Sequence, residues 1–193
     1  MTAQRSHVAL LRGVNVGGRN KLAMALLGEV VQSLGHAEVV TYAQSGNVAF
    51  AAQKRNTPDD AIAGDLAAAI AERTGVRAAV IVLGAAELAT VVRDNPFPGV
   101  SDHRLLHAVF LREPPEAAGH ESVAAAVARA RAKRSADDAR VVGRVLYLWT
   151  PEWFGRSVLR AELERGGANR TPMAEGTARN WATVVALTAL VPG

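Results

Sequence analysis

The chain has 193 residues, of which 49% are hydrophobic and 21% are charged, a composition typical of a folded protein and unlike that of a disordered one. This length suffices for one large domain or for two of roughly 90–100 residues each. The absence of cysteine excludes thiol catalysis, disulfides and cysteine-ligated metal sites. The formal net charge of +4 permits an anionic partner without requiring one.

The sequence shows no membrane or export signal. No apolar run reaches the roughly 18–20 residues that a membrane helix needs. The N-terminal stretch MTAQRSHVALLRG is too poor in apolar residues for a secretory signal. We therefore expect a cytoplasmic protein that does not contact a membrane.

The first half of the chain predicts the element order β-α-β-β-α-β, which is that of the ferredoxin-like split motif. The predicted elements are a buried strand at 7–14, a helix at 22–35 closed by Gly35, a hairpin of strands 38–44 and 48–52 around the turn Ser45-Gly46-Asn47, a helix at 56–75 ended by Gly75, and a strand at 77–83.

The second half repeats this order after a connecting helix. The predicted elements are a helix at 85–94 stopped by NPFP, a strand at 104–111, a helix at 121–134, a hairpin of strands 139–142 and 145–149, a helix at 157–165, and a short strand leading into a last helix at 178–190. We therefore predict an α+β protein made of two tandem ferredoxin-like (βαββαβ) plaits with a C-terminal helix. The first subdomain is expected at 1–84, and a linker helix with the second subdomain at 85–193.

The stretch RGVNVGGRN at 12–20 joins the first strand to the first helix. It matches neither the P-loop nor the dinucleotide-binding pattern. A glycine-rich loop at a helix start nevertheless leaves backbone N–H groups unpaired beside partial positive charge. Alternatively, its glycines only supply positive φ for a tight turn, with Asn20 as the helix cap. The candidate ligand-binding residues of this stretch are Arg12, Gly13, Asn15, Gly17, Gly18, Arg19 and Asn20.

Three predicted helix starts carry cations, which the helix dipole disfavours there. Arg19 and Lys21 lie at the start of the first helix, and Arg179 lies in the first turn of the last one. Arg156 lies just ahead of the helix that begins near Ser157. Together these positions indicate an external or internal anion. Alternatively, each cation is paired with a nearby carboxylate or is solvated.

Other polar and aromatic residues allow two interpretations each. Ser45 and Asn47 form a hairpin turn or present a hydroxyl and an amide to a ligand. Trp181 fits a helical core position better than a stacking platform. His103 and His107 lie in a predicted strand without a third ligand, so we expect no metal and no cofactor. No Ser-His-Asp set or carboxylate pair accompanies the loop, which leaves the catalytic residues unknown and enzyme activity an open question.

Six stretches occur in a distinctive order: RGVNVGGRNKLAM, TYAQSGNVAF, NPFP, VLYLW, GRS and TARNWATV. Together they resemble the bacterial domain-of-unknown-function family number 1697 over nearly the whole chain. The resemblance implies two ferredoxin-like subdomains in a small, soluble bacterial protein, and it implies no activity and no catalytic residues. The matching positions are Arg12, Gly13, Asn15, Gly17, Gly18, Asn20, Met24, Tyr42, Ser45, Gly46, Asn47, Arg179, Asn180 and Trp181.

The leading functional hypothesis is a binding module for a phosphate- or carboxylate-bearing small ligand. Arg12, Arg19 and Arg179 would supply charge, and the loop amides would supply hydrogen bonds, with Ser45, Asn47 and Asn180 completing the site. This hypothesis requires the two halves to bring the glycine loop and the last helix together.

Three alternatives stay open. The chain is a transferase- or hydrolase-type enzyme that uses the same anion site, or its motifs only lock the subdomains together and its partner is another protein. Nucleic acid is a further candidate through the basic run at 128–134, but it is not favoured. Such a run is more typical of a solvated helix face, and the predicted strands lack the aromatic residues of an RNA-binding sheet.

Overall fold

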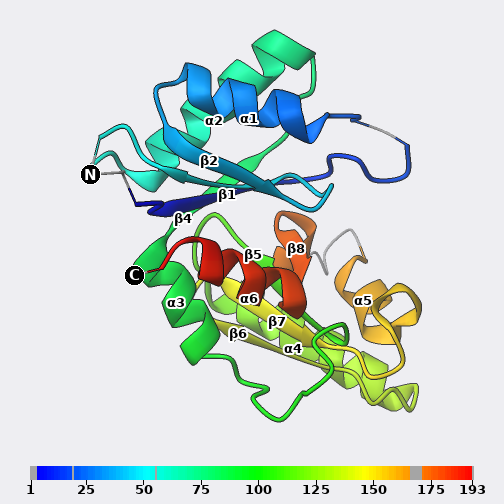
Figure 1. Ribbon diagram of the computed structural model, residues 1–193. Helices are drawn as coiled ribbons and strands as arrows, with labels where there is room; N and C mark the ends of the chain where they lie inside the picture. Colours follow the sequence, from blue (N-terminus) through cyan, green and yellow to red (C-terminus); the bar gives the residue numbers. More distant parts are fainter. Residues whose placement is uncertain (1–3, 19, 55, 166–170, 193) are drawn as a thin grey trace. The chain divides into compact units, whose positions relative to one another are not determined.

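The computed structural model shown in Figure 1 describes residues 4–18, 20–54, 56–165 and 171–192. The chain is α+β and contains two four-stranded sheets. Contacts divide it into unit 1, comprising Met1–Thr90 with Val185–Gly193, and unit 2, comprising Val91–Val184. The domain boundary expected between residues 84 and 85 stays a prediction.

In unit 1, two helices cover a sheet with strand order β2-β3-β1-β4. Every neighbouring pair of strands is antiparallel, and α1 and α2 lie together over the sheet (Figure 1). The core between these layers includes Leu27, Val30, Phe50, Leu66 and Ile70. The elements are β1 (His7–Leu11), α1 (Met24–Ser33), β2 (Ala37–Tyr42), β3 (Asn47–Ala51), α2 (Asp59–Thr74) and β4 (Val80–Gly84).

In unit 1, one helix end lies where the sequence predicted it, and one helix start does not. Gly75 ends α2 in the left-handed conformation (φ 71°), as predicted, and its N–H donates to the Ala71 carbonyl. Helix α1, however, begins only at Met24, and its N-cap residue makes no side-chain capping bond. Lys21 therefore lies ahead of the helix rather than in its first turn, and the dipole argument does not apply to it. Arg19 lies outside the described residues.

Unit 2 repeats the strand arrangement of unit 1. Its sheet has the order β6-β7-β5-β8 with antiparallel pairing throughout, so β5 takes the place that β1 has in unit 1. Helices α3 and α6 each contain residues of both units. The elements from α3 onward are α3 (Ala85–Arg93), β5 (Leu106–Phe110), α4 (Ala117–Ala132), β6 (Asp138–Val142), β7 (Val145–Trp149), η1 (Phe154–Arg156), α5 (Val158–Leu163), η3 (Pro172–Ala174), β8 (Thr177–Asn180) and α6 (Trp181–Leu190).

The last strand corrects the expected position of Arg179. This residue lies in β8, opposite Ala108 of β5, and not in the first turn of the last helix. Helix α6 begins two residues later, and the Asn180 side chain accepts a hydrogen bond from the Thr183 backbone N–H at 2.8 Å. Asn180 is thus the cap of α6, and the dipole argument does not apply to Arg179.

The start of α5 is occupied by an internal carboxylate. Asp137 is 4% exposed, and its Oδ2 accepts hydrogen bonds from the Ser157 hydroxyl at 2.8 Å and the Leu159 backbone N–H at 3.1 Å. The Arg160 backbone N–H donates in turn to the Ser157 hydroxyl at 2.9 Å. The start of this helix thus has a negative charge that the chain supplies itself.

Acid is expected to destabilise unit 2 through His107 of β5. Its ring stacks on Phe154 at 3.9 Å between centroids, and burial, followed by the charge of Arg160, lowers its pKa to about 4. Between about pH 4 and 6.5 the unfolded chain binds more protons at this residue, so stability falls as the pH falls through that range. We expect a loss of about 1–3 kcal/mol.

Urea denaturation at pH 7 and pH 4.5 checks this expectation, with H107L as the comparison. The pKa of His36 is also lowered, mainly by burial, so the informative quantity is the difference between wild type and H107L. Equal pH dependence in the two proteins would contradict the assignment to His107.

Candidate functional site

The glycine loop (residues 12–21) and the β2–β3 turn (residues 43–46) fold against each other in unit 1. The Leu11 N–H donates to the Gly46 carbonyl at 2.8 Å. Gly46 has a φ of 73°, and a Cβ there would lie 2.5 Å from Val14 Cγ2 and 2.8 Å from Leu11 Cβ. Only glycine fits this contact, which joins two stretches that the sequence singled out separately.

Asn15 stabilises the glycine loop through both polar atoms of its side-chain amide. Its Nδ2 donates to the carbonyls of Leu22 and Gln44, both at 2.8 Å. Its Oδ1 accepts from the Leu22 backbone N–H at 2.9 Å. Asn20 adds a bond from its own Nδ2 to the Gly13 carbonyl at 3.1 Å. These two asparagines, both at positive φ, therefore shape the loop.

The polar residues of the turn have a similar internal role. Asn47 is completely buried, and its Nδ2 donates to the Tyr42 carbonyl at 2.9 Å and to the Ser45 hydroxyl at 3.0 Å. The predicted hairpin turn is therefore present, and its amide group closes the turn.

Several described residues of the glycine loop are solvent-exposed, and two of them are cations. Arg12, the glycines at 13, 17 and 18, and Lys21 are all exposed, and the three glycines have positive φ. The Arg12 backbone N–H donates to the Ala79 carbonyl at 2.9 Å, which places the loop beside the segment that precedes β4. The first carboxylate in the sequence is Glu29, so the charged residues within the loop itself are all cations.

A shallow hollow of about 430 Å³ adjoins this segment and is bordered by Arg77 together with Ala67, Ala71, Ala78 and Ala79. Ala79 is the residue that accepts the Arg12 hydrogen bond. Arg77 was not predicted as a site residue, because the pattern of residues 77–83 predicts a strand, whereas β4 begins at Val80. The feature of the sequence that could have identified it is a charged residue at the first position of an otherwise apolar segment.

Arg179 and Asn180, the candidate residues of unit 2, both make local contacts. The Arg179 side chain is 7% exposed, and its Nη1 donates to the Thr177 hydroxyl and the Ala178 carbonyl, both at 2.8 Å. Burial lowers the pKa of Arg179 to about 10, so the side chain remains charged at neutral pH. The meeting of this residue with the glycine loop stays a prediction.

The basic run at 128–134 takes part in ion pairs. Arg129 Nε and Lys133 Nζ contact the Glu162 carboxylate at 2.7 and 2.6 Å, and Arg165 approaches it at 3.1 Å. Hydrogen bonds from Lys133 and then Arg129 lower the pKa of Glu162 to about 2. These contacts join α4 to α5 and favour a structural role for the run.

Two negative findings concern the described residues only. Within them, no group of three or more histidine, aspartate or glutamate side chains is placed to hold a metal ion. None of the helices there combines the length and the apolar character needed to cross a membrane.

Comparisons with known proteins place the chain among uncharacterised relatives. A family model described as "Protein of unknown function (DUF1697)" matches residues 4–147. No curated protein matches the chain. Among the solved structures that match, one is described as the structure of conserved bacterial protein SP0830 from Streptococcus pneumoniae. It has a TM-score of 0.69 and 19% sequence identity, covering 98% of this chain and 99% of that one. This likeness shows a shared fold.

Proposed function

We propose that this chain, which belongs to the family described as protein of unknown function (DUF1697), binds a small ligand carrying a phosphate or a carboxylate. The proposed site lies in unit 1. It comprises the exposed part of the glycine loop with Arg12, and Arg77 at the neighbouring hollow. The carrying observation is that internal hydrogen bonds hold a loop beside that hollow, and that the exposed residues of the loop include two cations and three glycines, together with Val16 and Asn20.

The chemistry of the loop favours binding over reaction. Guanidinium groups and backbone N–H groups of left-handed glycines bind anions. Residues 8–28 contain no aspartate, glutamate, histidine or cysteine, so the loop itself offers no general base or thiol nucleophile. Because its cations are exposed, each contributes about 0.2–1 kcal/mol, and we expect an affinity in the micromolar to millimolar range.

The proposal keeps the residues inferred from the sequence but separates their roles. Asn15, Asn20, Ser45 and Asn47 support the loop through the bonds described above. Arg12, Gly13, Gly17 and Gly18 contact the ligand, as does Arg19. Arg179 and Asn180 complete the site only if unit 2 contributes to it. We further propose that each unit is a ferredoxin-like plait, which its element order and sheet order support, and that the protein is bacterial and cytoplasmic.

The second candidate function is an architectural or protein-interaction role, and a specific observation favours it. Asn47 and Gly46 are buried and Asn15 is fully hydrogen-bonded, so these motif residues serve folding. A transferase- or hydrolase-type enzyme would need a carboxylate or histidine from elsewhere in the fold. It remains a third candidate without an observation of its own.

The anion site is tested by comparing R12A and R77A with R73A. Arg73 is an exposed cation of the same unit, 3.8 Å from Glu29. We expect isothermal titration with phosphate, pyrophosphate, citrate and adenosine monophosphate to give a Kd that is about 1.4- to fivefold weaker in R12A and in R77A. The Kd of R73A is expected to match wild type, and added salt is expected to weaken binding.

Two outcomes would contradict the proposal. One is the absence of binding by any of these anions at low ionic strength, and the other is equal binding by R12A, R77A and wild type. A short RNA that binds far more tightly than the monophosphate would instead favour nucleic acid. If R179K lowers stability without changing the Kd, Arg179 is architectural and not part of the site.

A further inference from the structure

The β5–α4 loop of unit 2 occupies the same place in the repeated topology as the glycine loop of unit 1. Each loop leads from the second-last strand of its sheet order into the first helix of its unit. Their compositions differ sharply, because the unit 2 loop reads Arg112-Glu113-Pro114-Pro115-Glu116. It is rich in carboxylates and proline, whereas the glycine loop contains neither.

This unit 2 loop borders a cavity of about 560 Å³, with the segment that leads into β8 on the other side. The cavity is lined by Leu111 and the loop residues, and across from them by Thr171, Pro172 and Glu175. Its volume lies within the range of about 300–1,000 Å³ that is usual for small-molecule sites. All of its lining residues belong to unit 2.

The walls of the cavity are held by close packing. A Cβ on Gly119 of α4 would lie 2.7 Å from Pro115 Cβ and 3.2 Å from Pro172 Cγ, so a proline from each wall packs closely against this glycine. The Leu111 N–H donates to the Arg144 carbonyl at 2.9 Å, which fixes the start of the loop. Proline rings add backbone rigidity, so the cavity is largely preformed.

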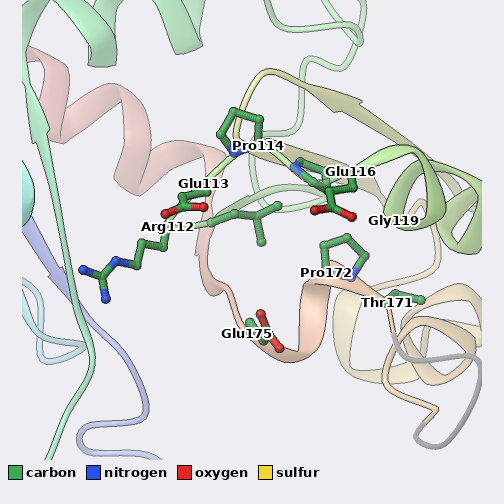
Figure 2. Close-up of a pocket in the computed structure, with 10 residues that line it drawn as sticks. Arg112, Glu113, Pro114, Glu116, Gly119, Thr171, Pro172 and Glu175 are labelled. Atoms are coloured by element: carbon green, nitrogen blue, oxygen red, sulfur yellow. The ribbon is translucent and has the colours of Figure 1, made fainter.

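The described lining of the cavity carries more carboxylates than cations. Glu113, Glu116 and Glu175 contribute three carboxylates, and Arg112 contributes one guanidinium. A second guanidinium, that of Arg144, lies at the start of the loop, where its Nη1 donates to the Arg112 carbonyl at 3.2 Å. In Figure 2 the three carboxylates lie around the hollow, and the Arg112 guanidinium extends away from Glu116 and Pro172. Glu116 also lies at the N-terminus of α4, where its charge offsets the positive end of the helix dipole.

The spacing of the carboxylates decides what kind of cation they suit. Within the described ranges, no three acidic or histidine side chains converge closely enough to coordinate one metal ion. In Figure 2 the carboxylates of Glu113, Glu116 and Glu175 lie apart from one another, an arrangement that suits separate positive groups on one extended molecule. Proline rings and Leu111 between them provide an apolar surface for a methylene chain.

From this geometry we infer that the cavity of unit 2 binds a small organic cation in which ammonium or guanidinium groups are joined by an aliphatic chain. The site is distinct from the proposed anion site of unit 1 and does not depend on it. Its carboxylates are exposed, so binding is expected to be weak and sensitive to salt.

The test uses the full chain with spermidine and argininamide as probes and titration calorimetry at low ionic strength. The variant E113Q/E116Q/E175Q removes the negative charge while keeping the side-chain shapes. Its matched control is E121Q/E152Q, which changes two exposed carboxylates of the same unit outside the cavity. G119A keeps the charges but forces Pro115 and Pro172 apart.

We expect the triple variant to bind both probes at least tenfold more weakly than wild type, and G119A at least threefold more weakly. The control E121Q/E152Q and the unit 1 variant R12A are expected to bind them as wild type does. The inference is overturned if neither probe binds at millimolar concentration, or if the triple variant binds as tightly as the control. R12A and R77A test phosphate binding, and the unit 2 variants test spermidine binding. Either proposal can therefore be contradicted without the other.

Discussion

Replacing Asn15 with alanine is expected to lower the free energy of unfolding by about 2–4 kcal/mol. The substitution removes three hydrogen bonds that join the glycine loop to Leu22 and to the β2–β3 turn. Each such bond contributes about 0.5–1.5 kcal/mol. Asn15 also has a φ of 55°, a conformation that asparagine tolerates and alanine does not.

Two further substitutions separate these effects. N15G removes the side chain but allows the positive φ, so it is expected to be less destabilising than N15A. N15D keeps the acceptor for the Leu22 N–H but loses both donors, and it places a carboxylate beside two carbonyls. Urea denaturation of the three variants measures the series. Stability within 0.5 kcal/mol of wild type for N15A, a threshold of about the size of a neutral surface change, would contradict a supporting role for Asn15.

The same variants connect the loop's architecture to its proposed function. If Asn15 shapes an anion site, N15G is expected to weaken phosphate binding even at temperatures where the protein remains folded. A variant that loses stability but binds phosphate as wild type does would show that the loop's shape and the binding are independent. R12A is expected to behave in the opposite way. Because the Arg12 side chain is exposed, its removal is expected to lower the affinity for phosphate more than the stability of the protein.

The sequence predicted those elements whose signals are local. Gly75 was expected to end a helix because glycine reaches the left-handed conformation without strain, and the structure shows that conformation. Trp181 was expected in the core. It is 5% exposed, with its ring 6.0 Å from that of Tyr147. Hydrophobic periodicity and cap chemistry depend on neighbouring residues alone, so they are readable without the fold.

The errors concern residues whose role depends on distant partners. Asn20 resembled a helix cap, but its side chain bonds to Gly13 and α1 begins later. Arg179 resembled a first-turn cation, yet pairing with β5 places it in a strand at the sheet edge. That pairing joins residues about 70 positions apart in the sequence, a separation at which local patterns carry no information.

The two candidate sites differ in the same way, because only one of them consists of residues that are neighbours in the sequence. The glycine loop was recognisable because its glycines and cations are adjacent in sequence. The cavity of unit 2 was not recognised, because its acidic loop is closed by Pro172 and Glu175, which follow more than 50 residues later. In the sequence, a proline pair flanked by glutamates indicates only a turn. The second wall of the cavity reaches this turn only when the chain is folded. Arg77 was overlooked for a related reason, since its importance lies in its position beside Ala79.

Replacing Asp137 with alanine is expected to lower the free energy of unfolding by about 2–4 kcal/mol, the second large effect. The carboxylate is buried and accepts hydrogen bonds from Ser157 and from the Leu159 backbone. Hydrogen bonds to a charged group contribute about 1.5–3 kcal/mol each, and their loss leaves buried donors unsatisfied. The favourable charge at the start of α5 is lost as well.

The neighbouring residue supplies a matched control. Asp138 pairs with Arg131 at 3.3 Å and with Arg140 at 3.6 Å, and both arginine side chains are mostly exposed. The Asp138 side chain is 17% exposed, and its Oδ1 also accepts the Ala139 backbone N–H at 3.0 Å. D138A is therefore expected to cost about 1 kcal/mol, less than D137A. A double-mutant cycle of D137A with S157A should give a coupling energy of about 0.5–3 kcal/mol, because the two side chains share one hydrogen-bond network.

The consequence of D137A should extend beyond the cap itself. Helix α5 carries Glu162, which Arg129 of α4 and Lys133, the residue after α4, bind, so a frayed start of α5 is expected to loosen this ion-pair cluster. Hydrogen exchange at Leu159–Leu163 and along the last turn of α4 measures that loosening. If D137A accelerates exchange in α5 alone, the two helices are held independently, and the Glu162 cluster contributes its own stability. If exchange increases in both helices, Asp137 is the residue through which the start of α5 supports the basic run of α4.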